Sequence, residues 1–531
     1  MERNRTSETT ACNLGGPPIA SVPRTQTSHH RRWLAWTAIL CLAVQSFVAN
    51  IAICQAGGGV LLIDTEDETT RTPVPARLEL FRDKGKPQLV RGVPSGGRGV
   101  IVSKPITLTL ADGTYPFRFT RGPEYRIIQG NFTLERTSDD SRIVALPRMV
   151  DMQAAGWLSC DMAIPPGTDD VRLRMMAEDL HVAAVIGELR PPRFPNALPE
   201  DTTPFEPIVC VAGNVAVEDG DVIIYPAGDT VVGEWLDVDE TARVAIANPF
   251  AFALPVWIAT QRVDGVFVLG DWLRDDKSVT RIDHGRRPQI VGFDNARGPG
   301  RYAELVYWNL LECGLRLVPL AGTGTRPGGA TTTAIGYNRV YASIGEVTQD
   351  HDAQNHADAI SAAVWAGASV ITNGPMLRPT LDGFPPGHVF RGVGGDKLAL
   401  SMAIDLSVRD EVDYLEIIVN GKSFYNARLD EFARAGGVLP LVEVDQSSWV
   451  IVRVVTRHED HYRMATSAPW FVDFDDLPRI SRKAVEFFRE WLVDAETELK
   501  ILPTEALSRY VPLVGAARRY WAQRADDATV D

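Results

Sequence analysis

The sequence predicts a central α/β domain flanked by an N-terminal and a C-terminal β-sandwich-like domain. Two patterns support this fold class. Strand-like and helix-like segments alternate between about residues 156 and 372, which is typical of layered or barrel α/β domains. Short runs of alternating apolar and polar residues, separated by turn residues, precede this region and follow it again, as they do in small β-sandwiches.

The composition is that of a globular protein that can bury a core. Its 531 residues are enough for about three domains. Hydrophobic residues make up 45% of the chain and charged residues 23%, which are ordinary values for globular proteins. The formal net charge is −14, with acidic and basic residues interspersed. Because no basic patch marks a phosphate-backbone partner, the sequence argues against nucleic-acid binding.

Residues 1–56 are predicted to be a leader outside the fold. A basic stretch ends at residues 29–32, an apolar run follows over about 33–53, and the small residue Ala56 comes shortly after it. This order is typical of a secretory signal and predicts a secreted or periplasmic, cell-envelope protein. The rival interpretation is an uncleaved membrane anchor, since the apolar run approaches the ~20 residues that a bilayer needs.

Residues 57–151 are predicted to form the first β-sandwich. Segments 76–81 and 105–110 alternate apolar and polar residues, as strands with one buried face do. Asp112-Gly113 supplies a hairpin-type turn after the second of these segments. No residue of this domain indicates catalysis.

Residues 152–375 are predicted to form the α/β domain. It opens with a strand from Gly156, a loop, and a helix that starts at Asp169 or Asp170. In α/β folds, chemistry takes place where such strands end. The other expected strands are 181–186, 208–217, 221–225, 263–269, 315–320 and 369–372, and the expected helices are 170–180, 302–313 and 356–366.

Residues 376–478 are predicted to form a second β-rich domain. Strands are expected at 398–406, 414–419 and 449–456, with a turn at Asn420-Gly421. The last part, 479–531, is predicted to contain an amphipathic helix that starts near Ser481 and covers the preceding domain.

Three cysteines lie beyond the leader: Cys160, Cys210 and Cys313. They are widely spaced, their number is odd, and no Cys-x-x-Cys pair occurs. The pattern therefore supports neither a disulfide framework nor a structural zinc site. Each is expected to act as a small buried hydrophobic residue.

A series of short segments occurs in an order found in one family of hydrolases. The segments are 177–186, 248–259, 263–264, 310–316, 336–341, 366–375, 414–421 and 479–483. Through them the chain resembles secreted members of the CehA/McbA-like branch of the PHP metallohydrolases. The resemblance implies a PHP-like central domain with a β-domain before it.

The metal-binding pattern of that family is broken in this sequence. In the family the first strand ends Gly-Asp-Leu-His-Val-His, and its two histidines hold a divalent metal that activates a water molecule. Here the same stretch reads Cys-Asp-Met-Ala-Ile-Pro, so that Asp161 remains while Ala163 and Pro165 replace both histidines. A further family histidine is missing near Asp271. The resemblance therefore implies a degenerate metal site.

Four residues remain candidates for metal binding: Asp161, His181, Glu234 and Asp271. His181 starts an apolar strand, and the alternative role for it is a core histidine that bonds to a neighbouring carbonyl. Glu234 and Asp271 belong to acidic clusters whose oxygens suit Mg²⁺ or Mn²⁺ better than zinc. Solvated acidic loops are the alternative interpretation of both clusters.

The glycine-rich loop 321–329 lacks the lysine of a P-loop and the spacing of a dinucleotide fingerprint. The resemblance places this loop at the mouth of the family's active site. A flexible rim and a ligand-binding loop are both open interpretations.

These observations predict an exported PHP-like homologue that has lost catalysis and acts as a binding or scaffold module. Its expected partner is a sugar-like small molecule or a polymer, and no cofactor and no catalytic residue are predicted. The first alternative is an active ester or phosphoester hydrolase with a rebuilt, oxygen-rich site for Mn²⁺, Mg²⁺ or Zn²⁺. A purely structural cell-envelope protein is the second alternative.

Overall fold

The computed structural model describes residues 58–531 except for 83–84, 200–206, 215–220, 227–239, 276–278, 280, 290, 327–332, 346–352 and 435. The chain divides into two compact units, Met1–Gly57 and Gly58–Asp531, and the helices and strands described here belong to the second. That unit is rich in β-structure and has few helices. The predicted leader lies outside the described residues. Within the described part, no helix is both long and apolar enough to cross a membrane.

Two sheets at the start of this unit form a β-sandwich. One sheet has the order β5-β1-β8 and the other the order β3-β4-β2-β6-β7. Their core contains Leu61, Leu78 and Phe119, all of them buried. The strands are β1 (Gly59–Asp67), β2 (Ala76–Leu80), β3 (Ser95–Gly96), β4 (Gly99–Val102), β5 (Ile106–Leu110), β6 (Gly113–Thr120), β7 (Ile128–Leu134) and β8 (Asp139–Leu146).

The prediction of a hairpin at Asp112-Gly113 is wrong. β5 pairs with β1, whereas β6 pairs with β2 and β7. The turn therefore carries the chain from one sheet of the sandwich to the other. A local turn signal does not determine which strands pair, because pairing also depends on which faces the two sheets bury.

A long mixed sheet forms the middle of the unit, in the order β15-β14-β13-β12-β11-β10-β9-β16-β17. β9, β10 and β11 are parallel to one another, as are β13, β14 and β15. The sheet curves, since β15 at its edge also contacts β9, β16 and β17. The strands are β9 (Trp157–Ile164), β10 (Val182–Ile186), β11 (Ile208–Asn214), β12 (Val222–Tyr225), β13 (Arg243–Ile246), β14 (Gly265–Leu269), β15 (Val318–Ala321), β16 (Arg339–Ser343) and β17 (Ser369–Thr372).

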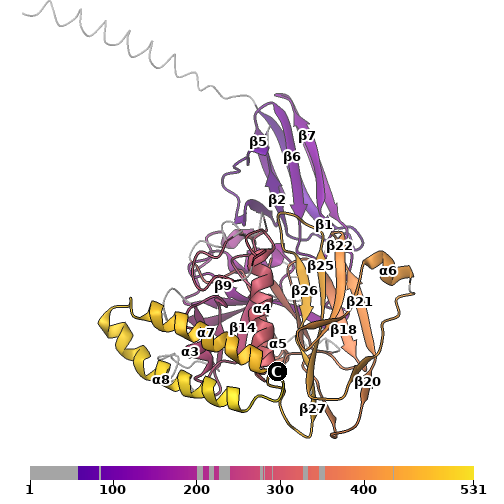
Figure 1. Ribbon diagram of the computed structural model, residues 1–531. Helices are drawn as coiled ribbons and strands as arrows, with labels where there is room; N and C mark the ends of the chain where they lie inside the picture. The colour runs from indigo at the N-terminus through magenta and orange to yellow at the C-terminus, as the bar shows by residue number, and fades with distance from the viewer. Residues whose placement is uncertain are drawn as a thin grey trace, which may run out of the picture. The chain divides into compact units, whose positions relative to one another are not determined.

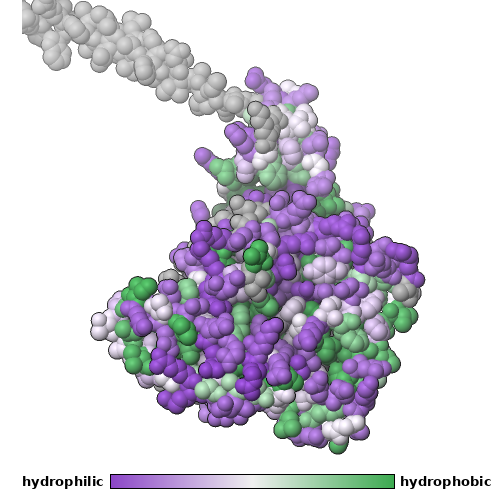
Figure 2. Space-filling model, in the orientation of Figure 1, coloured by the Kyte–Doolittle hydropathy of each residue, from purple (hydrophilic) through white to green (hydrophobic). Residues whose placement is uncertain are grey.

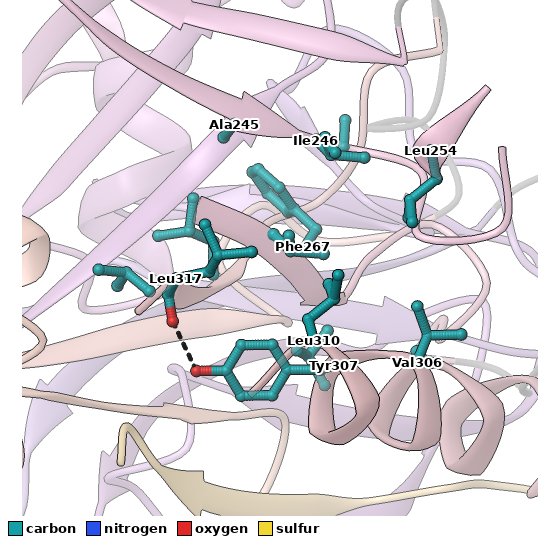
Figure 3. Close-up of a cluster of buried hydrophobic side chains, with 14 of the residues drawn as sticks. Ala245, Ile246, Leu254, Phe267, Val306, Tyr307, Leu310 and Leu317 are labelled. Atoms are coloured by element: carbon teal, nitrogen blue, oxygen red, sulfur yellow. Dashed lines mark hydrogen bonds between the residues drawn. The ribbon is translucent and has the colours of Figure 1, made fainter. Parts of the chain in front are cut away.

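Helices connect several of these strands: α2 (Val171–Ala177), α3 (Leu254–Ile258), α4 (Gly298–Glu312) and α5 (Ala353–Trp365). α4 packs against β14, and its Tyr307 and Leu310 lie in the same buried cluster as Phe267 (Figure 3). The Tyr307 hydroxyl donates a hydrogen bond to the Leu317 carbonyl at 2.8 Å (Figure 3). α2 ends earlier than predicted, because Asp179 adopts a positive φ of 52° that a helix cannot contain.

The central sheet continues into the C-terminal β-region, because β17 pairs with β26. The sheet therefore crosses the domain boundary expected at residue 375. The predicted strand 398–406 is split in two, and its halves join different small sheets, β20-β24 and β18-β21. The elements are β18 (Met376–Leu381), β19 (Val389–Gly392), β20 (Leu398–Leu400), β21 (Met402–Ser407), β22 (Val412–Val419), β23 (Lys422–Ala427), α6 (Leu429–Arg434), β24 (Val442–Val444), β25 (Ser448–Thr456), β26 (Met464–Ser467) and β27 (Trp470–Phe474).

The strands of this C-terminal region enclose a second hydrophobic core, which includes Leu415, Val452 and Trp470. The predicted turn at Asn420-Gly421 is confirmed, since it joins the antiparallel strands β22 and β23. Both turn residues have positive φ angles, 51° and 69°, as this type of hairpin requires.

Two C-terminal helices, α7 (Arg482–Leu499) and α8 (Thr504–Asp526), form a hairpin. α7 starts where the sequence predicts, with the Ser481 side chain accepting a hydrogen bond from the Ala484 amide. The pair packs against α3 and α4 of the central region (Figure 1), and the Trp521 indole donates to the Pro255 carbonyl at 2.9 Å. The expectation that the helix covers the preceding β-domain is thus wrong. Hydrophobic residues gather at the end of the hairpin on the face seen in Figure 2.

Candidate functional site

A pocket lies at the carboxyl ends of β9, β13, β14 and β15, which is the usual place for a site in an α/β fold. Ala163 contributes from β9, Asn248 follows β13, Asp271 follows β14, and Arg326 follows β15. The pocket has a free volume of about 70 Å³, which is room for roughly five water molecules. The family resemblance assigns the metal site to this edge of the sheet.

Asp161 is fully buried beside this pocket and is saturated with hydrogen bonds. Its Oδ1 accepts from the amides of Ala163 and Thr323, each at 3.0 Å. Its Oδ2 accepts from the Thr323 hydroxyl at 2.6 Å and from the Gly336 amide at 2.7 Å. A carboxylate offers about four acceptor sites. Asp161 therefore fixes the loop after β15 to β9 and has no lone pair left for a metal.

Burial is the main influence on the pKa of Asp161 and raises it to about 6, while the hydrogen bonds from Thr323 and Gly336 lower it. The carboxylate is consequently ionised at neutral pH, in agreement with the four donors that surround it.

Ala163 lies directly against the glycine-rich loop. The Gly324 amide donates to the Ala163 carbonyl at 2.9 Å. A Cβ placed on Gly322 would come within 2.7 Å of the Ala163 nitrogen and 2.9 Å of its Cβ. An imidazole at position 163 would need the space that this loop takes up. Pro165 is buried just beyond the end of β9, so neither position supplies a metal ligand.

Asp271 is the acidic candidate that does line the pocket, and its side chain is 33% exposed. Burial raises its pKa, and the positive charge of Arg326, whose Nε lies 3.5 Å from Oδ2, lowers it. The other polar residues of the lining are Asp221, Asn248, Arg274, Arg281, Asp283, His284 and Thr325, and the aromatic ones are Phe250, Phe267 and Trp272. The pocket thus combines both signs of charge with aromatic surface.

His181 lies at the other end of the strands, immediately before β10. Its Nδ1 accepts from the Ser159 amide at 3.1 Å, which assigns the ring proton to Nε2, 3.4 Å from the Gln153 side-chain oxygen. Burial lowers the pKa of His181 to about 4, so the ring is neutral at physiological pH. It borders a separate cavity of about 510 Å³ that also touches Asp67, Arg121 and Arg148.

The structure does not bring the four metal candidates together. Asp161 and Asp271 lie at one edge of the sheet, His181 at the other, and Glu234 lies outside the described residues. Among the residues that the structure describes, no group of three or more His, Cys, Asp or Glu side chains is arranged to hold a metal ion. Because Asp161 is saturated and Ala163 has no donor atom, these side chains do not fit the divalent metal of the family.

Sequence reasoning did not identify the arginines of the pocket, Arg274, Arg281 and Arg326. Arg274 and Arg281 lie in loops without a motif, and Arg326 lies in the glycine-rich loop 321–329, but only the fold brings the three to one place. The glycine-rich loop gave a signal: Gly322 packs closely against β9, and the Gly324 amide bonds to the Ala163 carbonyl of that strand. The three described cysteines, Cys160, Cys210 and Cys313, are free thiols.

No protein-family model matches the chain, and no curated protein matches it. Among solved structures, a fibronectin(III)-like module structure of Clostridium thermocellum CbhA has 14% identity and a TM-score of 0.13, covering 19% of this chain and 98% of that chain. The Parabacteroides merdae β-glucuronidase has 11% identity and a TM-score of 0.15, covering 76% of this chain and 59% of that chain. The four N-terminal Ig domains of Dscam1 isoform 8.4 have 8% identity and a TM-score of 0.12, covering 78% of this chain and 96% of that chain. Likenesses this weak carry no argument about fold or function.

Proposed function

We propose that this protein is an exported, PHP-like homologue of the CehA/McbA-like branch that no longer hydrolyses a substrate and acts as a binding module. The observation that carries the proposal is the environment of Asp161. The aspartate that the family resemblance associates with metal binding instead accepts four hydrogen bonds and joins β9 to the loop after β15. In this proposal Asp161 is a framework residue, because its four hydrogen bonds leave no lone pair for a metal.

Two features of the fold support the PHP-like part of the proposal. Parallel strands start the central sheet, and the sheet curves until β15 contacts β9. The pocket lies at the carboxyl ends of these strands, where barrel and layered α/β proteins carry their sites. The order of the family-like segments along the sequence supports the same assignment.

A sugar-like ligand, free or as part of a polymer, suits the pocket best. Asn248, Asp271 and His284 supply hydrogen-bonding groups, and Trp272 supplies aromatic surface. A few polar groups around an apolar floor are the usual composition of a small-molecule site. The small volume of about 70 Å³ admits one terminal group rather than a long segment of polymer.

The alternative is an active hydrolase with an oxygen-rich metal centre. Asp221, Asp271 and Asp283 line the same pocket, and carboxylates are preferred ligands of Mg²⁺ and Mn²⁺. This alternative requires a metal that survives dialysis and a measurable turnover.

Elemental analysis of the dialysed full-length protein, combined with ester and phosphoester hydrolysis assays, decides between the two. We expect no stoichiometric zinc, manganese or iron and no turnover. One tightly held metal per chain, with hydrolysis that is lost in Asp271→Asn, would overturn the binding-module proposal and establish the alternative.

Binding is tested by calorimetry with neutral oligosaccharides. Asp271→Asn and Arg326→Ala should weaken a bound sugar about tenfold each, since each removes a charged hydrogen-bonding group. Arg518→Ala is the matched control, because Arg518 is exposed and pairs with Glu496 on the distant α7–α8 hairpin. Equal sugar affinities in the wild type and all variants would mean that the ligand binds outside this pocket.

A further inference from the structure

A small cavity lies where the N-terminal sandwich, the central region and the C-terminal β-region meet. Five arginines line it, and they come from all three regions: Arg77, Arg118, Arg339, Arg409 and Arg463. Among the described residues of the same lining, two are carboxylates, Glu178 and Asp275. We call these five residues the arginine junction.

The carboxylates near the arginine junction gather around one of its members. Arg77 contacts Glu178 at 2.7 Å and Asp275 at 3.5 Å, and it also pairs with Glu79. Its single charge therefore has three acidic partners. The positive charges of the other four arginines must be neutralised by the remaining acidic side chains nearby.

That compensation is small. Asp410 pairs with Arg463 at 2.9 Å, and the same carboxylate also acts electrostatically on Arg409. Arg118 pairs with Glu79 at 3.7 Å. Arg409 donates to two backbone carbonyls, those of Gly122 and Tyr125.

Several buried donors at the arginine junction have no acceptor among the residues that the structure describes. They are the Nε atoms of Arg409 and Arg463 and the hydroxyl of Thr120. Unpaired buried donors are costly, and buried charges normally have a counter-charge. The side chain of Arg463 is only 9% exposed, so bulk solvent does not supply the missing acceptor.

The pKa values of two of these arginines are lowered. Burial, with the positive charges of Arg463 and Arg118 adding to it and the negative charge of Asp410 opposing it, lowers the pKa of Arg409 to about 10. Burial likewise lowers the pKa of Arg118, with Arg77 and Arg463 adding to the effect. Burial is therefore the main cause of both lowered pKa values, and the neighbouring guanidinium charges add to it. Burial also acts to lower the pKa of Arg463, but Tyr337 and Asp410 outweigh it and the net shift is upward.

We propose that the arginine junction binds a small oxyanion, a carboxylate, sulfate or phosphate group, between Arg118, Arg409 and Arg463. Guanidinium groups bind such anions through paired, charge-assisted hydrogen bonds. The cavity has about 30 Å³ of free space, room for roughly two water molecules. It therefore takes one oxyanion group, either a free ion or the pendant group of a larger ligand, and the anion links the three regions.

Thermal unfolding of the full-length protein provides the first test. Phosphate should raise the Tm of the wild-type protein by about 3–5 °C over chloride at equal ionic strength, once it exceeds its Kd by about a hundredfold. Arg409→Gln and Arg118→Gln should lose most of this increase. Arg378→Gln is the matched control, because its side chain is 25% exposed, close to the 27% of Arg118, but lies on β18 outside the cavity.

Calorimetric titration with inorganic phosphate, sulfate and acetate measures binding directly. We expect about tenfold weaker binding in Arg118→Gln, a partly exposed position that should fold even if Arg409→Gln does not. A sulfated monosaccharide that binds more tightly than sulfate would identify a pendant group, whereas equal or weaker binding would identify the free ion. No binding at millimolar anion, or equal Tm increases in the wild type and both variants, would overturn the proposal. Asp271→Asn leaves this site intact, so the two proposals fail independently.

Discussion

The two edges of the strand pair β9 and β10 bury ionisable side chains in opposite ways. Near the carboxyl edge, Asp161 stays charged and receives four hydrogen bonds from the chain around it. Near the amino edge, His181 stays neutral, with its Nδ1 accepting from the Ser159 amide. Both side chains meet the requirement that a buried polar group be hydrogen-bonded. Asp161 keeps its charge, which four donors stabilise, whereas His181 is uncharged and accepts a hydrogen bond. Neither residue keeps the free lone pair that a metal ligand needs.

The largest effect is expected from Asp161→Ala. This variant removes the acceptor of the buried Ala163 and Thr323 amides. The Gly336 amide keeps only the longer contact to the Thr323 hydroxyl, at 3.3 Å. The loss should lower the free energy of unfolding by about 3–5 kcal/mol, as removal of one partner from a buried charged network does. Urea denaturation measures it, and Asp161→Asn, which keeps one oxygen, should cost less. Wild-type stability in Asp161→Ala would show that Asp161 does not hold the loop.

A pH titration of stability tests the other edge. The pKa of His181 is lowered from 6.5 to about 4, so between these values the unfolded chain binds a proton that the folded chain does not. Stability should therefore fall as the pH decreases from about 6.5 to about 4, by up to about 3 kcal/mol from this residue. Above pH 6.5 its contribution is constant.

His181→Gln should flatten this part of the pH dependence relative to the wild type. Equal slopes in the wild type and His181→Gln would mean that the histidine is protonated in the folded state, and the contrast between the two edges would disappear.

A smaller effect is expected from Gly322→Ala. The added Cβ would lie 2.7 Å from the Ala163 nitrogen and 2.9 Å from Asp161 Oδ1, so the loop must shift. Overpacking of this kind costs about 1–3 kcal/mol. Gly515→Ala in α8 is the control, since its nearest neighbour would be 3.9 Å away and alanine favours a helix by up to about 1 kcal/mol. If both variants had the same stability, the loop would not be tightly packed against β9.

Local sequence signals correctly predicted the features that depend only on residues close together in the chain. The start of α7 follows from Ser481 as a cap and the apolar spacing behind it, and the β22–β23 turn follows from Asn420-Gly421. All the contacts that form a helix cap or a two-residue turn lie within a few consecutive residues, so the identity and order of those residues determine the feature.

Local sequence signals did not predict the elements that form only by contact with a distant segment of the chain. Asp112-Gly113 has the residues of a hairpin turn, but the sandwich uses it to change sheets. β13 and β16 were not predicted, although both are central strands of the long sheet. α8 was missed because its buried residues, such as Trp521, are recognised as a core face only against α3 and α7.

For the candidate site, the residue types alone exclude Ala163 and Pro165 as metal ligands, because neither side chain carries a donor atom. The surroundings of Asp161, by contrast, follow from the folded arrangement. Thr323 and Gly336 lie 162 and 175 residues from Asp161 in the chain, and the arginines of the pocket and of the junction come from separate regions. Hydrogen bonds and charge balance depend on distances in space, which no local sequence pattern records.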